Sequence, residues 1–236
     1  MLSKYEIQRF LSENSIYQYD IKSNNTVDVF ENVNIVTKQE CCPVKFGTIS
    51  GDFNIQNCNL TSLKNMPENV KGHFNCRSNN LNSLEGSPKF VGTNYYCSHS
   101  CLKTLKGIPE YINGILDVSE NLLENFKYAP KSVSKIIRAE KNNIISLEGI
   151  PYTTHSYINL NFNPIEKLNL KDIEHLENDL ILCFCDKKGI LIEHFESFYS
   201  HHQDLEISIL KIKKVLQYHE MIDNFDKKNT KKSSKI

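Results

Sequence analysis

Residues 116–126 read Leu-Asp-Val-Ser-Glu-Asn-Leu-Leu-Glu-Asn-Phe, and the chain repeats this pattern of residue types every 21 positions. Each copy has two apolar residues at alternate positions, a small residue three positions later, and then two more large apolar residues. The six copies begin at Phe53, Phe74, Tyr95, Leu116, Ile137 and Ile158. A fixed period of this length predicts a solenoid, in which each repeat forms one right-handed turn and buries its apolar residues by stacking on its neighbours.

The recurring positions also predict the path of one turn. The first two apolar residues alternate with polar ones, which is the period of a short β-strand. The small residue is Asn in four copies, Cys58 in the first copy and Ser100 in the third. We expect its side chain to satisfy backbone groups where the chain bends off the strand, because an unpaired buried backbone group is costly.

Five of the seven prolines follow the same period, at Pro67, Pro88, Pro109, Pro130 and Pro151. Proline fixes its own backbone torsion and cannot donate to a strand ladder, so this series marks the return segment of each turn rather than the strand. The segment between Leu63 and Phe74 is too short and too rich in Pro and Gly for a good helix. We therefore expect an extended or 3₁₀ return and a thin convex side.

The tract Leu-Asp-Val-Ser-Glu-Asn-Leu-Leu at residues 116–123 resembles bacterial leucine-rich repeats of the Leu-x-Val-x-x-Asn-x-Leu type. Residues 74–88 are similar to repeat proteins of bacteria and large tailed phages. The resemblance covers roughly residues 27–168 and implies an α/β leucine-rich repeat solenoid that is curved, with a parallel sheet on its concave side. It implies little about activity, because solenoids serve many partners.

The N-terminal part of the chain departs from the 21-residue period. We expect residues 1–31 to form an N-terminal cap, in which Ser3 caps a helix and Thr26–Phe30 forms a strand. We expect the solenoid to span residues 32–168, with an irregular first turn near Val33. Terminal repeats are normally irregular, because they close an exposed apolar end.

After residue 168 the period stops. Residues 169–225 predict a mainly helical C-terminal cap, because an uncapped solenoid end would expose a large apolar patch. A separate effector domain is the alternative for this part. Residues 226–236 form a Lys-rich tail that we expect to be disordered and solvated.

The charge balance and hydropathy of the chain exclude several classes of function. Lys plus Arg and Asp plus Glu number 28 each, which gives no global attraction to nucleic acid or to membranes. No apolar run approaches the about 20 residues that span a bilayer, and the N-terminus has no hydrophobic signal core. We therefore expect a cytoplasmic protein, or one that acts in a host cytoplasm if it is an effector.

The eight cysteines do not indicate a disulfide framework. Three of them fall on small buried positions of the repeat: Cys58, Cys76 and Cys97. We expect the thiols to stay reduced in a cytoplasmic protein. A pair at Cys183 and Cys185 lies near His175 and His194 but lacks a second ligand pair with zinc spacing, so the zinc signal is weak. We predict no metal and no cofactor.

The candidate binding residues alternate with the buried strand residues and should point outward along the sheet. Arg and Tyr concentrate at the energetic centres of protein interfaces. Four such residues are our expected anchors: Arg77, Tyr96, Arg138 and Tyr157. Four neighbours are expected around them: His73, Asp117, Glu140 and Phe162. The alternative is that strand positions favour Tyr and Ile for their own sake.

These observations predict a non-catalytic module that binds a protein partner through its concave face. No nucleophile with a matched base, no carboxylate dyad and no phosphate-binding Gly motif stands out, so we predict no enzyme and no catalytic residues. One alternative is a structural or assembly protein that binds through its C-terminal helices. A nucleic-acid-binding protein is less favoured, because acidic residues share the face with Arg77 and Arg138. For a phage or bacterial source, the resemblance implies an effector that blocks or redirects a host factor.

Overall fold

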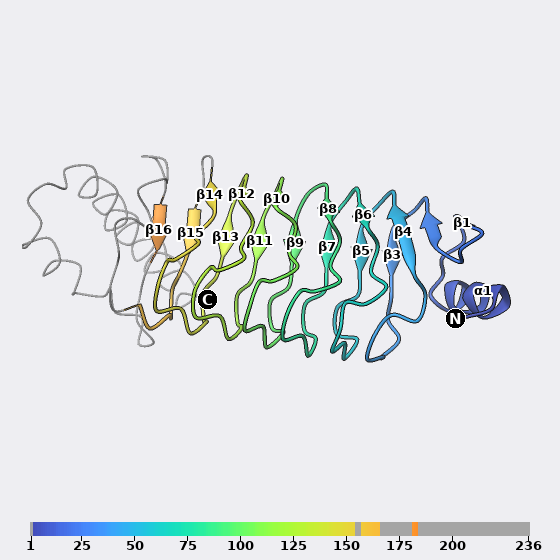
Figure 1. Ribbon diagram of the computed structural model, residues 1–236, viewed down its shortest axis with the longest axis horizontal. Coiled ribbons are helices and arrows are strands. Elements are labelled where there is room, and N and C mark those ends of the chain that lie inside the picture. Colours follow the sequence, from blue (N-terminus) through green and yellow to red (C-terminus); the bar gives the residue numbers. More distant parts are fainter. Residues whose placement is uncertain (1, 154–156, 166–180, 184–236) are drawn as a thin grey trace, which may run out of the picture.

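The computed structural model of this chain describes residues 2–153, 157–165 and 181–183. These residues form a β-solenoid, in which short strands from successive turns lie side by side and pair in parallel (Figure 1). Phe53 lies opposite Phe74, and Leu116 lies opposite Ile137, so equivalent positions of neighbouring repeats meet. The predicted parallel-strand repeat architecture is therefore confirmed.

The first strand of each repeat belongs to one eight-stranded sheet, which we call the main sheet. Its order is β16-β15-β13-β11-β9-β7-β5-β3. Its strands are β3 (Val33–Asn34), β5 (Phe53–Asn54), β7 (Phe74–Asn75), β9 (Tyr95–Tyr96), β11 (Leu116–Asp117), β13 (Ile137–Arg138), β15 (Tyr157–Asn159) and β16 (Ile181–Cys183). All the predicted repeat starts thus lie in one register on one sheet.

A second series of strands runs along another side of the coil, and we call its two sheets the side sheets. Their orders are β1-β2-β4-β6-β8 and β10-β12-β14, and apart from the antiparallel pair β1 and β2 they are parallel. Their strands are β1 (Tyr19–Ile21), β2 (Val27–Val29), β4 (Phe46–Ile49), β6 (Asn69–Val70), β8 (Phe90–Val91), β10 (Tyr111–Ile112), β12 (Ser132–Val133) and β14 (Tyr152–Thr153).

The side sheets refine the expectation for the return segment. The segment after each proline is extended, as one of the two predicted forms, but it also pairs with its neighbours. Pro67 lies two residues before β6, so its missing N–H removes no hydrogen bond from the strand ladder. Val70 is fully buried, which anchors the short strand against the core. The return is therefore a second stack of strands rather than an unpaired connection.

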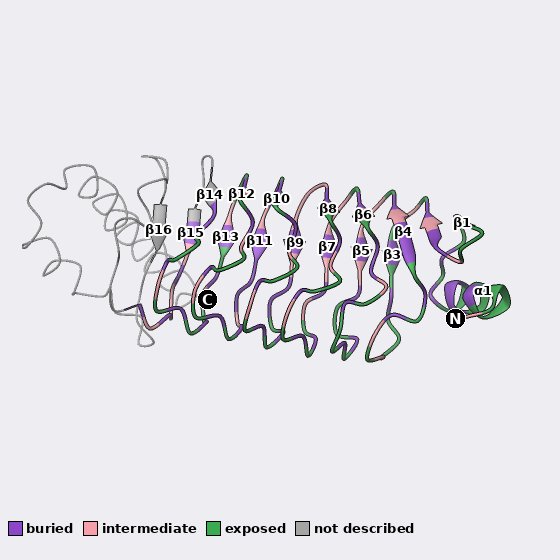
Figure 2. Ribbon diagram, viewed as in Figure 1, coloured by how far each residue is buried: buried purple, intermediate pink, exposed green. Residues whose placement is uncertain are grey.

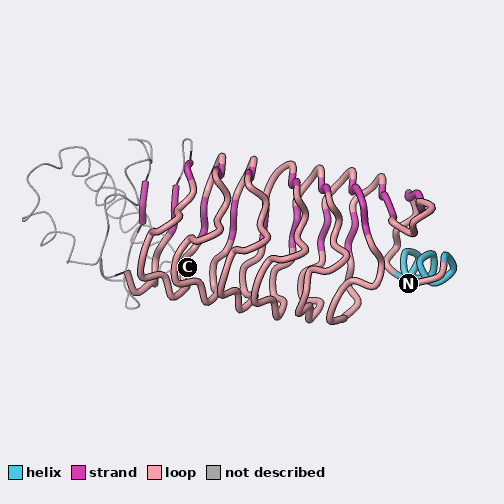
Figure 3. Tube along the Cα trace, viewed as in Figure 1, coloured by secondary structure: helices cyan, strands magenta, loops and turns pink. Residues whose placement is uncertain are grey.

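The N-terminal segment supplies the only helix among the described residues (Figure 3). Helix α1 spans Lys4–Glu13 and begins with a capping box: Ser3 Oγ accepts from Glu6 N at 3.3 Å, and Glu6 Oε2 accepts from Ser3 N at 2.7 Å. Its buried face joins the solenoid core. Asn14 Oδ1 accepts from Val36 N at 3.3 Å, which ties the end of the helix to the first turn. The predicted cap residue and the strand near residue 28 are both confirmed.

Stacked side chains fill the interior of the coil, and Figure 2 shows buried residues recurring in each turn. The rings of Phe53 and Phe74 are parallel with centroids 6.0 Å apart, and Tyr95 follows at 5.1 Å from Phe74. The Tyr95 hydroxyl is buried but contacts Ser87 Oγ at 2.7 Å. Each turn therefore packs mainly on the turns beside it, which is the stacking that the period predicted.

The small residue of each repeat builds a ladder of hydrogen bonds between turns. Asn121 Oδ1 accepts from the backbone N–H groups of Ser100 at 3.0 Å and Leu102 at 2.9 Å, both in the preceding turn. Its Nδ2 donates to the carbonyl oxygens of Cys97 at 3.1 Å and Val118 at 3.0 Å. Asn79, Asn142 and Asn163 make the same kind of contacts. The predicted role of this position in the bend is confirmed.

The residue before each ladder position adopts a left-handed backbone conformation. These residues have φ between 52° and 62°: Asn57, Ser78, His99, Glu120, Lys141 and Phe162. Only Gly, Asn and Asp adopt this region readily, because a Cβ is crowded there. The bend therefore stores some backbone strain, and its side chains are turned outward beside the main sheet. We call these six residues the bend row.

Several predictions from the sequence concern residues outside the described part of the chain. These are the helical C-terminal cap at 169–225, the tail at 226–236 and the zinc signal at Cys185, His175 and His194. Within the described residues, none of the helices has the length and apolar character needed to cross a bilayer.

The ladder predicts a large cost for losing one amide. Asn121→Ala should lower the free energy of unfolding by about 3 kcal/mol, because buried N–H and C=O groups lose their partners. The exposed Asn80, whose side chain makes no hydrogen bond within the described residues, offers a matched control, and Asn80→Ala should change stability by less than about 0.5 kcal/mol. Urea unfolding followed by circular dichroism measures both. Equal effects of the two substitutions would contradict the ladder.

One rung of the ladder is incomplete, which predicts a stabilising substitution. Ser100 Oγ lies 3.5 Å from Asn79 N, and no partner reaches the buried N–H of Leu81 within the described residues. Ser100→Asn should supply the missing acceptor and raise the free energy of unfolding by about 1 kcal/mol. The same unfolding experiment tests it, and a loss of stability would mean that the core at this turn has no room for the amide.

Candidate interaction surface

Side chains that alternate with the buried residues of the main sheet point away from the core and form its outer face. They lie in three rows because successive turns are in register. The entry row contains Asn32, Asp52, His73, Asn94, Ile115 and Ile136. The strand row contains Asn34, Asn54, Asn75, Tyr96, Asp117, Arg138 and Asn159. The exit row contains Gln56, Arg77, Ser98, Ser119, Glu140 and Asn161.

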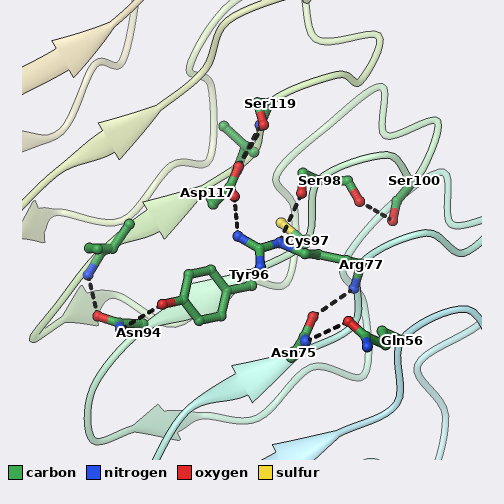
Figure 4. Close-up of polar contacts among 12 residues, drawn as sticks. Gln56, Asn75, Arg77, Asn94, Tyr96, Cys97, Ser98, Ser100, Asp117 and Ser119 are labelled. Carbon is green, nitrogen blue, oxygen red and sulfur yellow. Dashed lines mark hydrogen bonds and ion pairs between the residues drawn. The ribbon is translucent and has the colours of Figure 1, made fainter. Parts of the chain in front are cut away.

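Arg77 is the centre of a cluster that crosses three turns (Figure 4). Its guanidinium lies over the Tyr96 ring, 4.1 Å from the centroid, and its Nη2 forms an ion pair with Asp117 Oδ2. Arg77 Nε also donates to Ser98 Oγ at 3.0 Å. On the far side, Asp117 Oδ1 accepts from Ser119 Oγ at 2.7 Å. We call these five residues the Arg77 cluster.

The Arg77 cluster acts as a clamp rather than as a set of free contacts. Asp117 is only 3% exposed, and such a carboxylate is costly unless a cation stays paired with it. The Arg77 side chain keeps 30% of its surface exposed, and half-buried Tyr96 lies beneath its guanidinium. The structure thus brings three of the expected binding residues together, and it places Asp117 beneath the surface.

The polar members of the entry row form a second ladder. Asn32, Asp52 and Asn94 each accept the N–H of the equivalent residue one turn later through Oδ1, at 2.8, 2.7 and 2.7 Å. His73 does the same through Nδ1, which lies 3.3 Å from the N of Asn94. The same Nδ1 also contacts Thr93 Oγ1 at 2.6 Å. The row then changes character at Ile115, whose side chain has no acceptor.

Tyr96 is held by contacts from its own turn and from the turn before it. Its hydroxyl accepts from Asn94 Nδ2 at 2.7 Å, and its ring lies 6.0 Å from the ring of His73. Asn75, one turn earlier, donates to Gln56 Oε1 at 3.0 Å. The N-terminal half of the outer face is therefore a network in which each of these polar side chains has a partner.

The bend row carries a surface ion-pair ladder. Glu120 lies between two side chains from the adjacent turns: His99 Nε2 is 2.9 Å from Glu120 Oε2, and Lys141 Nζ is 3.0 Å from Glu120 Oε1. All three side chains are at least one-third exposed, so each contact stabilises the fold by no more than about 1 kcal/mol. The row nevertheless fixes the order of charges along one border of the outer face.

Glu140 and Asn161 form an unsatisfied pair in the exit row. The two residues are directly opposed, because Lys141 N donates to Asn161 O at 2.9 Å in the ladder between their turns. Glu140 Oε2 and Asn161 Oδ1 are both buried, and neither has a hydrogen-bond partner within the described residues. Burial raises the pKa of the Glu140 carboxyl, and the nearby carboxylates of Asp117 and Glu120 raise it further.

The other expected residues differ in how the structure places them. Arg138 is exposed, and its side chain forms no hydrogen bond or ion pair within the described residues. Phe162 is half-buried in the bend row with φ 62°, which is unusual for a bulky residue. Tyr157 lies in β15, opposite Ile181, but its side chain lies outside the described part of the structure.

Reasoning from the sequence missed the residues that hold the anchors in place. Ser98 and Ser119 accept or donate within the Arg77 cluster, and Asn94 connects Tyr96 to the entry-row ladder. The sequence feature that could have indicated them is their position, since each occupies an outward row beside an anchor residue. Their residue type alone gave no reason to separate them from ordinary surface Ser and Asn.

Metal binding finds no support in the described part of the chain, where no three His, Cys, Asp or Glu side chains gather at one point. All six cysteines described there are free thiols. Burial raises the pKa of the Cys76 and Cys97 thiols, which keeps them protonated and poorly nucleophilic.

The clamp predicts different costs for the two arginines of the outer face. Arg77→Met should lower the free energy of unfolding by about 2 to 3 kcal/mol, because the buried Asp117 carboxylate loses its cation. Arg138→Met is the matched control and should change stability by less than about 0.5 kcal/mol, since the Arg138 side chain has no hydrogen-bond or ion-pair partner among the described residues. Chemical unfolding measures both, and equal costs would show that Arg77 is not a clamp.

Replacing Glu140 with a neutral isostere should raise the free energy of unfolding by an amount that depends on pH. Its pKa is raised, so its contribution to stability is present when it is protonated and is lost as the pH rises through its folded-state pKa. Glu140→Gln should therefore match the wild type at acidic pH and exceed it by about 1 kcal/mol at neutral pH, where its amide can donate to Asn161 Oδ1. Unfolding curves at both pH values, with the exposed Glu148→Gln as control, test this. A less stable variant at neutral pH would contradict it.

Comparison of the chain with protein-family models, with curated proteins and with solved structures finds no match. Its architecture is therefore defined by its own structure: a β-solenoid of parallel strands whose repeat is 21 residues, as in the pairing of Phe74 with Tyr95. The outer face of the main sheet, with one paired half and one partly unpaired half, is the feature from which a function can be inferred.

Proposed function

We propose that this chain is a leucine-rich-repeat-type solenoid that binds a protein partner through the outer face of its main sheet and catalyses no reaction. The leucine-rich assignment is supported by the Leu-x-Val-x-x-Asn-x-Leu pattern at residues 116–123, whose Asn makes the inter-turn ladder. In this reading the outer face is the concave face of the coil, and the side sheets lie on its thin return side.

The preorganisation of the outer face is the observation that carries the proposal. Arg77 and Tyr96 contact each other and are held by three further side chains, Asp117, Ser98 and Asn94, before any partner arrives. Binding costs the ordering of side chains at an interface, so a surface that is already ordered loses less free energy on association. Tyr and Arg are also the residue types that dominate binding at such surfaces.

The pairing of ionisable groups supports binding rather than catalysis. Asp117 is committed to Arg77, and Glu120 is committed to His99 and Lys141. A general acid or base must be able to exchange its proton with a substrate, which these contacts oppose. Alternating signs along the face also disfavour a polyanion, because carboxylates lie beside each cation. The free, buried cysteines fit a reducing cytoplasm.

Site-specific photocrosslinking tests the proposal. Ile136, half-buried in the entry row, would be replaced by benzoylphenylalanine in the full chain, and exposed Tyr111 of the side sheet would serve as the matched control position. In lysate of the source organism, the Ile136 probe should crosslink a distinct protein, excess unlabelled wild-type chain should compete the adduct away, and the Tyr111 probe should not form it. Identical adducts from both positions, or adducts that nuclease removes, would contradict the proposal.

A further inference from the structure

The two halves of the outer face differ in whether their polar groups are satisfied. In the N-terminal half, the exit-row and strand-row side chains pair with one another, as in Asn54 with Asn34 at 2.9 Å and Arg77 with Ser98 at 3.0 Å. In the C-terminal half, Glu140 and Asn161 each keep a buried oxygen without a partner, and Arg138 has no ion pair within the described residues. The transition falls between the turns of β11 and β13.

The entry row changes one turn earlier, at Ile115 in the turn of β11. Its side-chain ladder ends at Ile115, so the N–H of Ile136 receives no acceptor from the preceding turn. Ile115 and Ile136 are both half-buried and put apolar surface into the entry row, on the other side of the strand row from Glu140 and Asn161. Apolar side chains on the same face as polar groups that still need partners are features of an interface centre, where water is excluded.

Leaving these groups unsatisfied is costly for the free chain. A buried oxygen without a hydrogen bond loses its interaction with water and gains nothing in return. The repeat itself shows a cheaper solution one or two turns away, because Ser98 and Ser119 occupy the same exit row and are fully paired. The position of Glu140 therefore opposes the stability of the chain alone.

We propose that the partner docks on the turns of β13 and β15 and that it presents a basic side chain to Glu140 and Asn161 and an acidic side chain to Arg138. This inference rests on the proposed function and locates it on the face. A Lys or Arg head group supplies the donors that both unpaired oxygens lack, and a carboxylate supplies the acceptor that fits a guanidinium. The recognised segment is thus a stretch of polypeptide with a basic and an acidic residue close together.

The charges around Glu140 favour a cationic group supplied by the partner. Asp117 is paired with Arg77, and Glu120 is paired with Lys141 and contacts His99, so Arg77 and Lys141 already have acidic partners other than Glu140. Arg138 is the nearest unpaired cation of the face, and it lies two residues earlier on the same turn. The carboxyl group can turn about its last torsion, which lets either oxygen meet a donor that arrives from outside.

Peptide display tests the inference directly. Random peptides displayed on phage would be selected on the full chain, and enriched peptides would be synthesised and titrated by fluorescence anisotropy. We expect enriched sequences with adjacent basic and acidic residues, whose affinity falls about tenfold or more for Glu140→Gln and for Arg138→Met. Lys127→Met, which removes an exposed charge on the return segment, is the matched control and should leave the affinity unchanged.

Each other outcome would overturn the inference. Enriched peptides that bind Glu140→Gln as well as the wild type would show that the carboxylate is not part of the site. A screen without enrichment would show that the face binds no such peptide. Glu140→Gln is expected to fold at least as well as the wild type, so a loss of affinity cannot be a loss of structure. A partner that crosslinks from the Ile136 probe equally in the wild-type chain and in the Glu140→Gln variant would overturn this inference and leave the proposed function standing.

Discussion

The asparagine ladder is the contact on which the rest of the structure depends. Each turn must bend sharply after its strand, and the bend turns backbone N–H and C=O groups into an apolar interior. The side-chain amide of Asn121 satisfies such backbone groups: it accepts hydrogen bonds from the turn before it and donates one within the same bend. Because the amide connects two turns, it also fixes their spacing and register. The outward rows inherit that register, so surface side chains meet their neighbours at repeated, defined positions.

The outer face shows what a fixed register makes possible. Arg77 and Asp117 are 40 residues apart in sequence, yet two steps along the sheet bring them into one ion pair over the ring of Tyr96. The same geometry makes the entry-row ladder, in which one side chain serves the backbone of the next turn. These contacts stiffen the face at little cost, because the backbone positions were already set by the core. A stiff face with defined rows presents its side chains at fixed positions.

The period of the sequence was enough to predict the main sheet, its register and the role of the bend residue, because Phe74, Leu116 and their equivalents recur without insertion. It was not enough for the side sheets, since a two-residue strand such as Asn69–Val70 is too short to show an alternating pattern. The rows of the outer face followed from the same period, but the pairing within them did not. Whether Arg77 extends toward solvent or lies across Tyr96 depends on side-chain rotamers, which composition and spacing leave open.

A repeat protein offers an internal standard for judging which residues serve the fold. Every turn solves the same structural problem, so an unpaired buried group at a position that most turns satisfy does not help the chain to fold. Ser98 and Ser119 satisfy the exit row, whereas Glu140 replaces a small hydroxyl with a carboxyl whose pKa is raised by burial and by neighbouring acids. In the same turn, Arg138 of the strand row is exposed and forms no hydrogen bond or ion pair within the described residues. Unpaired groups on one turn lower the stability of the chain alone, and this cost is the physical basis for proposing that a partner binds there.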